Sequence, residues 1–136
     1  HTETSQAAEE ATLEDVEKLR SSLRRTMWGQ VGVIRSRESL IRATAQLSRW
    51  TQLVARFSTT RAELEVKNMV QVAQCVAEAA LWRENSVGAH YRSDCPEAKR
   101  AGWQQHSRLS SGEVVSGKTL QKKSRGLLLS LRGRIG

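Results

Sequence analysis

Residue types that build β-sheet and disulfide-rich domains are scarce in this chain of 136 residues. The chain has one Pro, one Phe, one Tyr and two Cys, and aromatic residues make up 4% of it. Strands are enriched in aromatic residues and small secreted domains in cysteine, so this composition disfavours a β-sandwich or a disulfide scaffold. It favours a helical domain with a mostly aliphatic core, and the length suits one small domain with extensions.

The two cysteines, Cys75 and Cys95, also lack the spacing of a metal site, so we expect a reducing compartment, with a single disulfide as the alternative. Cys75 stands among Val and Ala residues, and we expect it to be buried as a small hydrophobe, with Cys95 more exposed. No apolar run approaches the ~20 residues of a membrane span. Because the first residue is His1 and not Met, we expect a processed or trimmed chain from which any targeting segment has already gone.

The excess positive charge of the chain lies in its last third. The net charge is +8, yet residues 1–98 hold 13 basic and 13 acidic residues, whereas residues 99–136 hold nine basic residues and one acidic residue. A basic tail attracts acidic proteins, phosphate backbones or anionic lipid. We therefore expect 108–136 to be an extended, partner-binding tail. Its candidate contact residues are Lys118, Lys122, Lys123, Arg125, Leu128, Arg132 and Arg134.

Apolar residues recur at three- and four-residue steps in three stretches, which predicts three amphipathic helices. The expected helices cover residues 13–29, 37–57 and about 61–84. Thr12 with Asp15 and Thr60 with Glu63 form the pattern of a capping box, and Ser36 is a suitable N-cap for the middle helix. Short connectors between such helices favour an antiparallel up-down-up bundle.

The boundaries of this domain follow from the flanking composition. Residues 1–11 are polar and are expected to form a flexible N-terminus. Pro96 is expected in the first turn of a short fourth helix over 96–107, which closes the domain at 12–107. The predicted fold class is therefore all-α: an antiparallel three-helix bundle with a short fourth helix and an extended basic C-terminal tail.

A short polar loop after the third helix collects four residues that mark a candidate site, Gly88, His90, Arg92 and Asp94. As a catalytic group, the last three would act as general base, anion clamp and orienting carboxylate. No nucleophile or metal ligand accompanies them, so we favour a structural role in which they tie the loop to helix ends. Gly88 suits a turn with positive φ. We expect no catalytic, cofactor-binding or metal-binding residue.

Four segments resemble, in the same order, the C-terminal domain of L-aspartate oxidase and of the succinate dehydrogenase and fumarate reductase flavoproteins. They are Leu23–Trp28, Val31–Ser36, Leu64–Met69 and Ala89–Pro96. The resemblance spans about 13–106 and implies a three-helix bundle attached to a flavin domain and a capping domain, where hydride passes to FAD. No segment resembles the family's substrate residues, and the sequence has no Gly-x-Gly-x-x-Gly fingerprint, so we expect no cofactor on this chain.

One departure from the family bears on function. Where the family has Glu-Ser-Arg-Gly, this chain has Asn85, Ser86, Val87 and Gly88, so both charged residues are replaced by uncharged ones. A buried Arg at a domain junction needs its carboxylate partner, and the loss of both together indicates a relaxed junction. We infer that this domain does not dock on a flavin domain in the family's way.

The function expected from the sequence is that of a non-catalytic structural or interaction subunit of a larger assembly, with protein subunits as partners. We expect an organellar location, the chloroplast rather than the mitochondrion, because plant members of the resembled family work in plastids. One alternative is the C-terminal part of an FAD-dependent L-aspartate oxidase or succinate dehydrogenase-type oxidoreductase whose flavin domain is on another chain. A second is a nucleic-acid-binding accessory protein whose basic tail contacts phosphates, with anionic lipid as a further tail partner.

Overall fold

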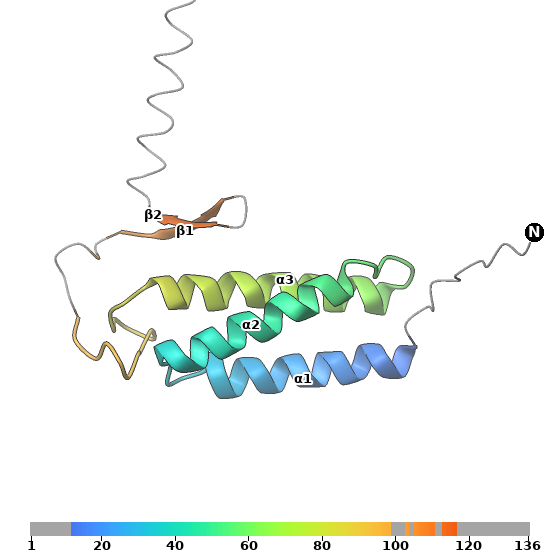
Figure 1. The fold of residues 1–136 in the computed structure, drawn as a ribbon, viewed down its shortest axis with the longest axis horizontal. Helices are drawn as coiled ribbons and strands as arrows, with labels where there is room; N and C mark the ends of the chain where they lie inside the picture. The colour runs from blue at the N-terminus through green and yellow to red at the C-terminus, as the bar shows by residue number, and fades with distance from the viewer. Residues whose placement is uncertain (1–11, 99–102, 104, 111–112, 117–136) are drawn as a thin grey trace, which may run out of the picture.

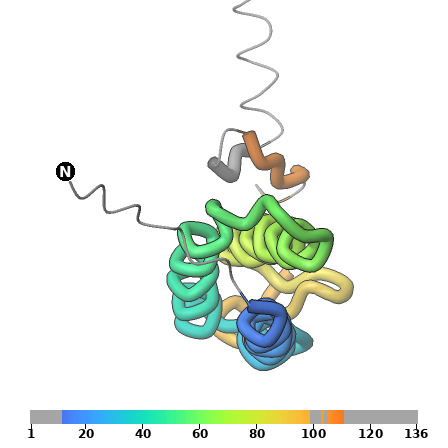
Figure 2. The backbone as a smooth tube through the Cα atoms, turned by 90° about the vertical axis from the view of Figure 1, so that its right-hand side faces the viewer, coloured from blue at the N-terminus to red at the C-terminus, as the bar shows by residue number. Residues whose placement is uncertain are grey.

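The computed structural model describes residues 12–98, 103, 105–110 and 113–116, and within them the fold is an all-α bundle with a small hairpin (Figure 1). The elements are α1 (Leu13–Val31), α2 (Arg37–Val54), α3 (Arg61–Trp82), β1 (Ser107–Ser110) and β2 (Glu113–Ser116). The three helices run antiparallel to their sequence neighbours and surround a common centre (Figure 2). The predicted three-helix bundle is confirmed.

The starts of the three helices are set by the predicted N-caps. The hydroxyls of Thr12, Ser36 and Thr60 each accept the backbone N–H of the residue three positions on. In return, the backbone N–H of Ser36 donates to the side chain of a second serine, Ser39. The backbone N–H of Thr60 donates to the side chain of Glu63, as predicted. These caps satisfy amides that the first turn of a helix leaves unpaired, which explains why sequence located the starts well.

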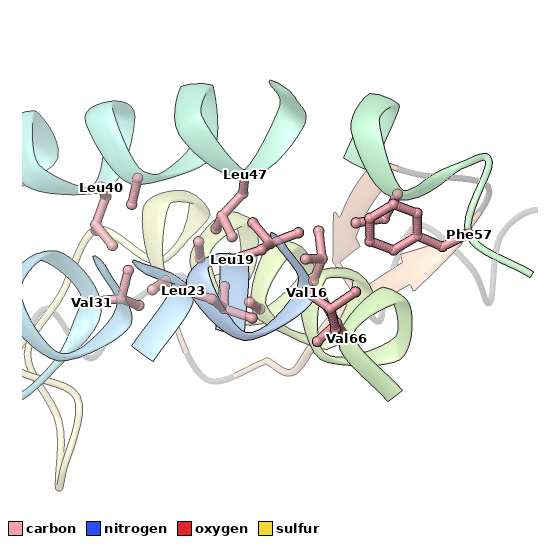
Figure 3. Close-up of a cluster of buried hydrophobic side chains, with 14 residues drawn as sticks. Val16, Leu19, Leu23, Val31, Leu40, Leu47, Phe57 and Val66 are labelled. Atoms are coloured by element: carbon pink, nitrogen blue, oxygen red, sulfur yellow. The ribbon is translucent and has the colours of Figure 1, made fainter. Parts of the chain in front are cut away.

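The core consists of aliphatic side chains from all three helices and one ring (Figure 3). Its 14 buried members are Val16, Leu19, Leu23, Val31, Leu40, Ala43, Leu47, Val54, Phe57, Val66, Val70, Ala73, Ala77 and Ala80. Along each helix they are separated by three, four, seven or eight residues, which are the spacings of one helix face, so each helix buries one stripe. Phe57, just beyond the end of α2, closes one end of the core.

The outer side of α3 departs from expectation at Cys75, which is exposed rather than buried. Successive residues of a helix are rotated by about 100°, so Cys75 lies on the face opposite the buried Ala73 and Ala77. Val72 and Val76 are exposed as well. The hairpin β1–β2 lies against α3 (Figure 1), which covers only part of that face. Among the described residues, none of the helices is apolar for long enough to cross a membrane.

The expected fourth helix over 96–107 is wrong where the structure describes it, because residues 96–98, 103 and 105–107 are not helical. Ser107–Ser110 instead pairs antiparallel with Glu113–Ser116, in the register Ser107 to Ser116 and Ser110 to Glu113. The side chain of Arg83 donates to the carbonyl oxygens of Trp103 (3.3 Å) and Gln105 (2.5 Å). A helix over 96–107 would use the Trp103 carbonyl for its own hydrogen bond to residue 107, so this contact competes with the predicted helix.

Trp103 is further held against the end of α3. Its ring meets that of Trp82 edge-on, with centroids 5.0 Å apart and planes at 80°, and the Arg83 guanidinium lies 5.7 and 5.9 Å from the two ring centroids. Both are favourable aromatic and cation–π geometries. This anchor, made by the residues at the end of α3, directs the chain back along that helix towards the hairpin.

Two glycines of α1 and its C-cap should respond in opposite ways to alanine. A Cβ at Gly29 meets nothing within 4 Å, so Gly29→Ala should raise the free energy of unfolding by about 0.5–1 kcal/mol through helix propensity. A Cβ at Gly32 would overlap the carbonyl oxygen of Trp28, so Gly32→Ala should lower it by about 1–3 kcal/mol. Urea unfolding followed by circular dichroism measures both, and equal effects would contradict this geometry.

Candidate functional site

The loop after α3 lies where three helix ends meet. Because the bundle is antiparallel, the C-terminal ends of α1 and α3 and the start of α2 share one end of the molecule (Figure 1). The loop pairs with the connector between α1 and α2: Arg35 N–H donates to Tyr91 O (3.1 Å) and Ser93 N–H donates to Arg35 O (2.7 Å). This short parallel bridge positions the side chains of the candidate site.

Arg92 is the most deeply buried charged side chain described, with 1% of its surface exposed. Its Nη1 donates to the carbonyl oxygens of Leu81 (2.9 Å) and Arg83 (3.1 Å), at the end of α3. Its Nε and Nη2 donate to the two carboxylate oxygens of Asp94, at 3.1 and 2.6 Å. Arg92 therefore caps carbonyls that α3 leaves unpaired and holds Asp94 in a bidentate pair.

Asp94 links this pair to the second helix. Its Oδ1 accepts the backbone N–H of Arg37 (3.1 Å), the first residue of α2, where the helix dipole favours a negative charge. The side-chain hydrogen bond from Arg92 lowers the pKa of the Asp94 carboxyl. A carboxyl whose pKa is lowered by folding stabilises the fold above its unfolded pKa and loses that contribution as the pH falls through the folded pKa.

His90 connects the loop to the end of α3 directly and to the end of α1 through Arg35. Arg35 Nη1 lies 2.8 Å from His90 Nδ1, and His90 Nε2 lies 3.1 Å from the carbonyl oxygen of Arg83. Arg35 in turn donates from Nε to Val31 O (2.9 Å) and Gly32 O (3.2 Å), at the end of α1. Burial is the main cause of the lowered pKa of the His90 imidazole; the hydrogen bond to the Arg83 carbonyl opposes this shift, and the nearby arginines add to it. Both ring nitrogens are thus engaged in contacts inside the domain.

Gly88 provides the turn that returns the loop onto the bundle. Its φ is +59°, a region that residues with a Cβ rarely adopt, and the turn is closed by hydrogen bonds between Val87 and His90. The Ser86 hydroxyl accepts a hydrogen bond from the backbone N–H of Arg92 (2.9 Å) and donates one to the carbonyl oxygen of Cys95 (2.6 Å). The structure therefore brings His90, Arg92 and Asp94 into one network, with the helix-end groups as its partners.

Sequence reasoning missed two members of this network, Arg35 and Arg83. Arg83 directly follows α3 and Arg35 lies four residues after α1, and basic side chains at such positions often cap the last carbonyls of a helix, although the predicted third helix, 61–84, included Arg83. That position was the available signal. The partner of Arg35 on the loop, His90, is 55 positions away in sequence, so this pairing follows from the packing of the three helices.

The two residues that depart from the family's loop lie in different environments. Asn85 is buried and its Oδ1 has no hydrogen-bond partner within the described residues. Val87 is 56% exposed, so a longer charged side chain at its position would project from the domain. The departure from Glu-Ser-Arg-Gly therefore changes both the inside and the outside of the same turn.

The two cysteines differ in environment as well as in exposure. Cys95 is half-buried, and burial first, then the neighbouring Asp94, raises the pKa of its thiol. Its Sγ lies 3.6 Å from an oxygen of Asp94. A raised pKa lowers the thiolate fraction that attacks electrophiles, so these contacts do not activate Cys95 as a nucleophile.

Thiol labelling should separate these two residues. In native protein, Ellman's reagent should modify exposed Cys75 rapidly and Cys95 more slowly, because less of the Cys95 thiol is ionised. Cys75→Ser should remove the fast phase and Cys95→Ser the slow one, as followed by absorbance. A fast phase that survives Cys75→Ser would contradict the assignment.

An apolar groove lies between α1 and α3, away from the loop network. Its volume is about 450 Å³, and its lining residues are Leu23, Arg24, Met27, Asn68, Met69, Val72, Ala73 and Val76. Further large apolar side chains are exposed nearer the loop, among them Trp28 (78% exposed), Val33, Ile34 and Tyr91. Contiguous exposed apolar surface marks sites where proteins associate, and Ile34 and Tyr91 flank the bridge between Arg35 and Arg92.

The predicted tail is only partly described, since its residues 108–110 and 113–116 form the hairpin. The seven candidate contact residues of the tail, from Lys118 to Arg134, lie outside the described residues, as does the predicted flexible segment 1–11. Within the described part of the chain, no cluster of three or more His, Cys, Asp or Glu side chains is placed to hold a metal ion.

Comparison with known proteins gives a consistent match. Residues 20–125 match the family model described as the fumarate reductase flavoprotein C-terminus. L-aspartate oxidase of Synechocystis is 33% identical over 118 residues, which cover 70% of this chain and 21% of that protein. L-aspartate oxidase of Yersinia pestis is 35% identical over 79 residues, covering 55% of this chain and 15% of that protein.

Solved structures match over the same region. Sdh1 of Mycobacterium smegmatis in complex with UQ1 superposes with a TM-score of 0.60 at 28% identity, over 74% of this chain and 20% of that one. The Sdh1 complex in the apo form gives a TM-score of 0.61 at 26% identity, over 80% and 21%. The chain thus spans between 15% and 21% of the length of these relatives and structures.

Proposed function

Because the chain belongs to the family of fumarate reductase flavoprotein C-terminal domains, we propose that it acts without catalysis, as a structural and interaction subunit of a larger assembly. The observation that carries the proposal is the use of the loop's polar groups. A general base needs a nitrogen or oxygen free to take a substrate proton, whereas His90 is bonded on both ring nitrogens. Arg92 and Asp94 bind each other and helix ends.

The exposed apolar surface supports an interaction role. Trp28, Val33 and Ile34 are large side chains that water solvates poorly, and the groove between α1 and α3 is lined mainly by apolar residues. Such surface fits protein partners better than a phosphate backbone, which needs basic side chains. Asn85 and Val87 support a mode of association different from that of the family, because neither carries the charge found there.

A second function is favoured by the names of the relatives. The matched proteins include L-aspartate oxidases, and this chain corresponds to about a fifth of the length of the one from Synechocystis. In that case the domain would support an FAD-dependent oxidoreductase site on another chain. Its contribution would be structural, through the same loop and apolar surface.

A complementation assay separates the two functions. Synechocystis L-aspartate oxidase is truncated to remove the matched region, and this chain is added in trans while L-aspartate oxidation is measured. We expect no restored activity, whereas the natural C-terminal domain of that oxidase, added as the control, should restore it. A double variant, Asn85→Glu with Val87→Arg, should restore more than the unmodified chain if the loop charges decide docking. Full activity with the unmodified chain would contradict the scaffold proposal and favour the oxidoreductase one.

Two expectations from the sequence stay predictions. Immunodetection in isolated chloroplasts and mitochondria tests the expected chloroplast location. Binding of the full chain to nucleic acid or to anionic vesicles, measured against salt concentration, tests the tail, because phosphate contacts weaken steeply with salt.

A further inference from the structure

The imidazole of His90 is held between two groups whose hydrogen-bonding roles are fixed. Arg35 Nη1, at 2.8 Å from Nδ1, can only donate, and the carbonyl oxygen of Arg83, at 3.1 Å from Nε2, can only accept. Nδ1 must therefore accept and Nε2 must carry the proton. The geometry selects one neutral tautomer of His90 and joins the loop to α1, through Arg35, and to the end of α3.

Protonation of His90 is incompatible with this arrangement. A proton on Nδ1 would face the Arg35 guanidinium as donor against donor and charge against charge, only 2.8 Å away in a half-buried site. We propose that His90 is a proton-operated clasp, whose protonation releases the loop from Arg35 and opens the bridge between the loop and the α1–α2 connector.

The charged groups around the ring do not offset an added proton. Arg35 lies on the connector and contacts the ring, while Arg83 at the end of α3 and Arg92 on the loop carry positive charges that also oppose an added proton. The Asp94 carboxylate is already bonded to Arg92 and to the backbone of α2. Glu84 is paired with Arg37 at 3.5 Å on the exposed side of the loop.

Protonation of His90 would also change the exposed surface beside the bridge. In the parallel bridge between Arg35 and Arg92, these two side chains lie on the inner side and are partly or fully buried. Their neighbours Ile34 and Tyr91 point to the opposite side and are exposed. Opening the bridge would separate Ile34 from Tyr91. The effect on docking rests on the proposed function, whereas the proton-coupled opening does not.

The direction of the effect follows from linkage. Burial and the three arginines lower the pKa of His90 in the folded domain, so the unfolded or opened loop binds the proton more readily. The closed loop is favoured above the ordinary histidine pKa of about 6.5 and is weakened as the pH falls below it. One proton changes the opening equilibrium by at most about tenfold per pH unit.

Nuclear magnetic resonance of the full 136-residue chain tests the clasp. Long-range ¹H–¹⁵N spectra of the histidine rings report the tautomer and the titration of His90, and amide exchange reports the bridge through Ser93 N–H and Arg35 N–H. At a pH of about 7.5, above the ordinary histidine pKa, we expect the Nε2–H tautomer. On lowering the pH to about 5.5, protection of the two amides, corrected for the intrinsic exchange rate, should fall in step with His90 protonation.

Two variants complete the test. In His90→Gln the amide can accept from Arg35 and donate to the Arg83 carbonyl but cannot titrate, so protection should no longer depend on pH in this range. His106→Gln, at an exposed histidine outside the network, should behave as the unmodified chain. The Nδ1–H tautomer at neutral pH, which needs no variant to detect, or an unchanged loss of protection in His90→Gln would overturn the proposal.

Discussion

Replacing Arg92 with Met should lower the free energy of unfolding by about 3 kcal/mol, the lower end of the range for breaking a buried ion pair, because the Asp94 side chain is 31% exposed. The Met side chain fills similar space but donates no hydrogen bond. The carbonyl oxygen of Leu81 then loses its side-chain donor, the carbonyl oxygen of Arg83 keeps only the bond from His90, and Asp94 loses the cation that pairs with it at the start of α2. The unpaired Leu81 carbonyl and the lost ion pair account for most of the cost.

The chain offers a matched control in Arg42→Met. Arg42 binds Glu38 at 2.6 Å, the same distance that separates Arg92 from Asp94, but both Arg42 and Glu38 are exposed. An exposed pair within one helix contributes about 0.3–0.5 kcal/mol, so this variant should unfold nearly as the unmodified chain does. Urea unfolding measures both variants. Equal losses would show that Arg92 does not tie the helix ends together.

Leu47→Ala should lower the free energy of unfolding by about 2–5 kcal/mol, because it opens a cavity in the centre of the bundle. Leu47 is fully buried on α2, among core residues of the other two helices (Figure 3). A helical bundle of this size has few such residues, so the loss is a large part of the total stability.

Leu53→Ala on the same helix is the control for this substitution. Leu53 is 41% exposed, so it leaves no closed cavity and loses only part of the transfer free energy of its side chain. We expect its cost to stay below about 1.5 kcal/mol in the same urea titration. A Leu47→Ala variant no less stable than Leu53→Ala would contradict the position of the core.

The three helices could be predicted from sequence because local rules set them. Side-chain caps at Thr12, Ser36 and Thr60 mark the starts, and the spacing of apolar residues marks the buried stripes. Neither rule depends on distant parts of the chain. Helix ends were less well placed, since α1 continues to Val31 and α2 ends at Val54, before Phe57.

Two predictions were wrong: the fourth helix and the burial of Cys75. The first depends on contacts between distant residues, and the second on the angular position of a residue around its helix. The sequence around Trp103 is compatible with a helix. In the structure, however, the Arg83 side chain donates to the carbonyl oxygens of Trp103 and Gln105, and the Trp82 ring packs edge-on against the Trp103 ring. Cys75 was judged by its apolar neighbours in sequence, although its angular position on α3 places it on the exposed side.

The candidate loop was found from sequence, but its partners were not. The spacing of His90, Arg92 and Asp94 suggested a common role at helix ends. Which atoms they meet depends on the antiparallel packing that gathers the ends of α1 and α3 and the start of α2. The structural role of the loop stays a prediction, which the Arg92 variant tests.

Gentle affinity purification of the tagged chain from its native source, with mass spectrometry of its partners and an absorbance scan for flavin, tests the central claim most directly. We predict a multisubunit assembly in which this chain is stoichiometric and no family flavin domain with bound FAD accompanies it. Recovery of one flavoprotein partner with stoichiometric FAD would contradict the scaffold function and make the chain part of an oxidoreductase.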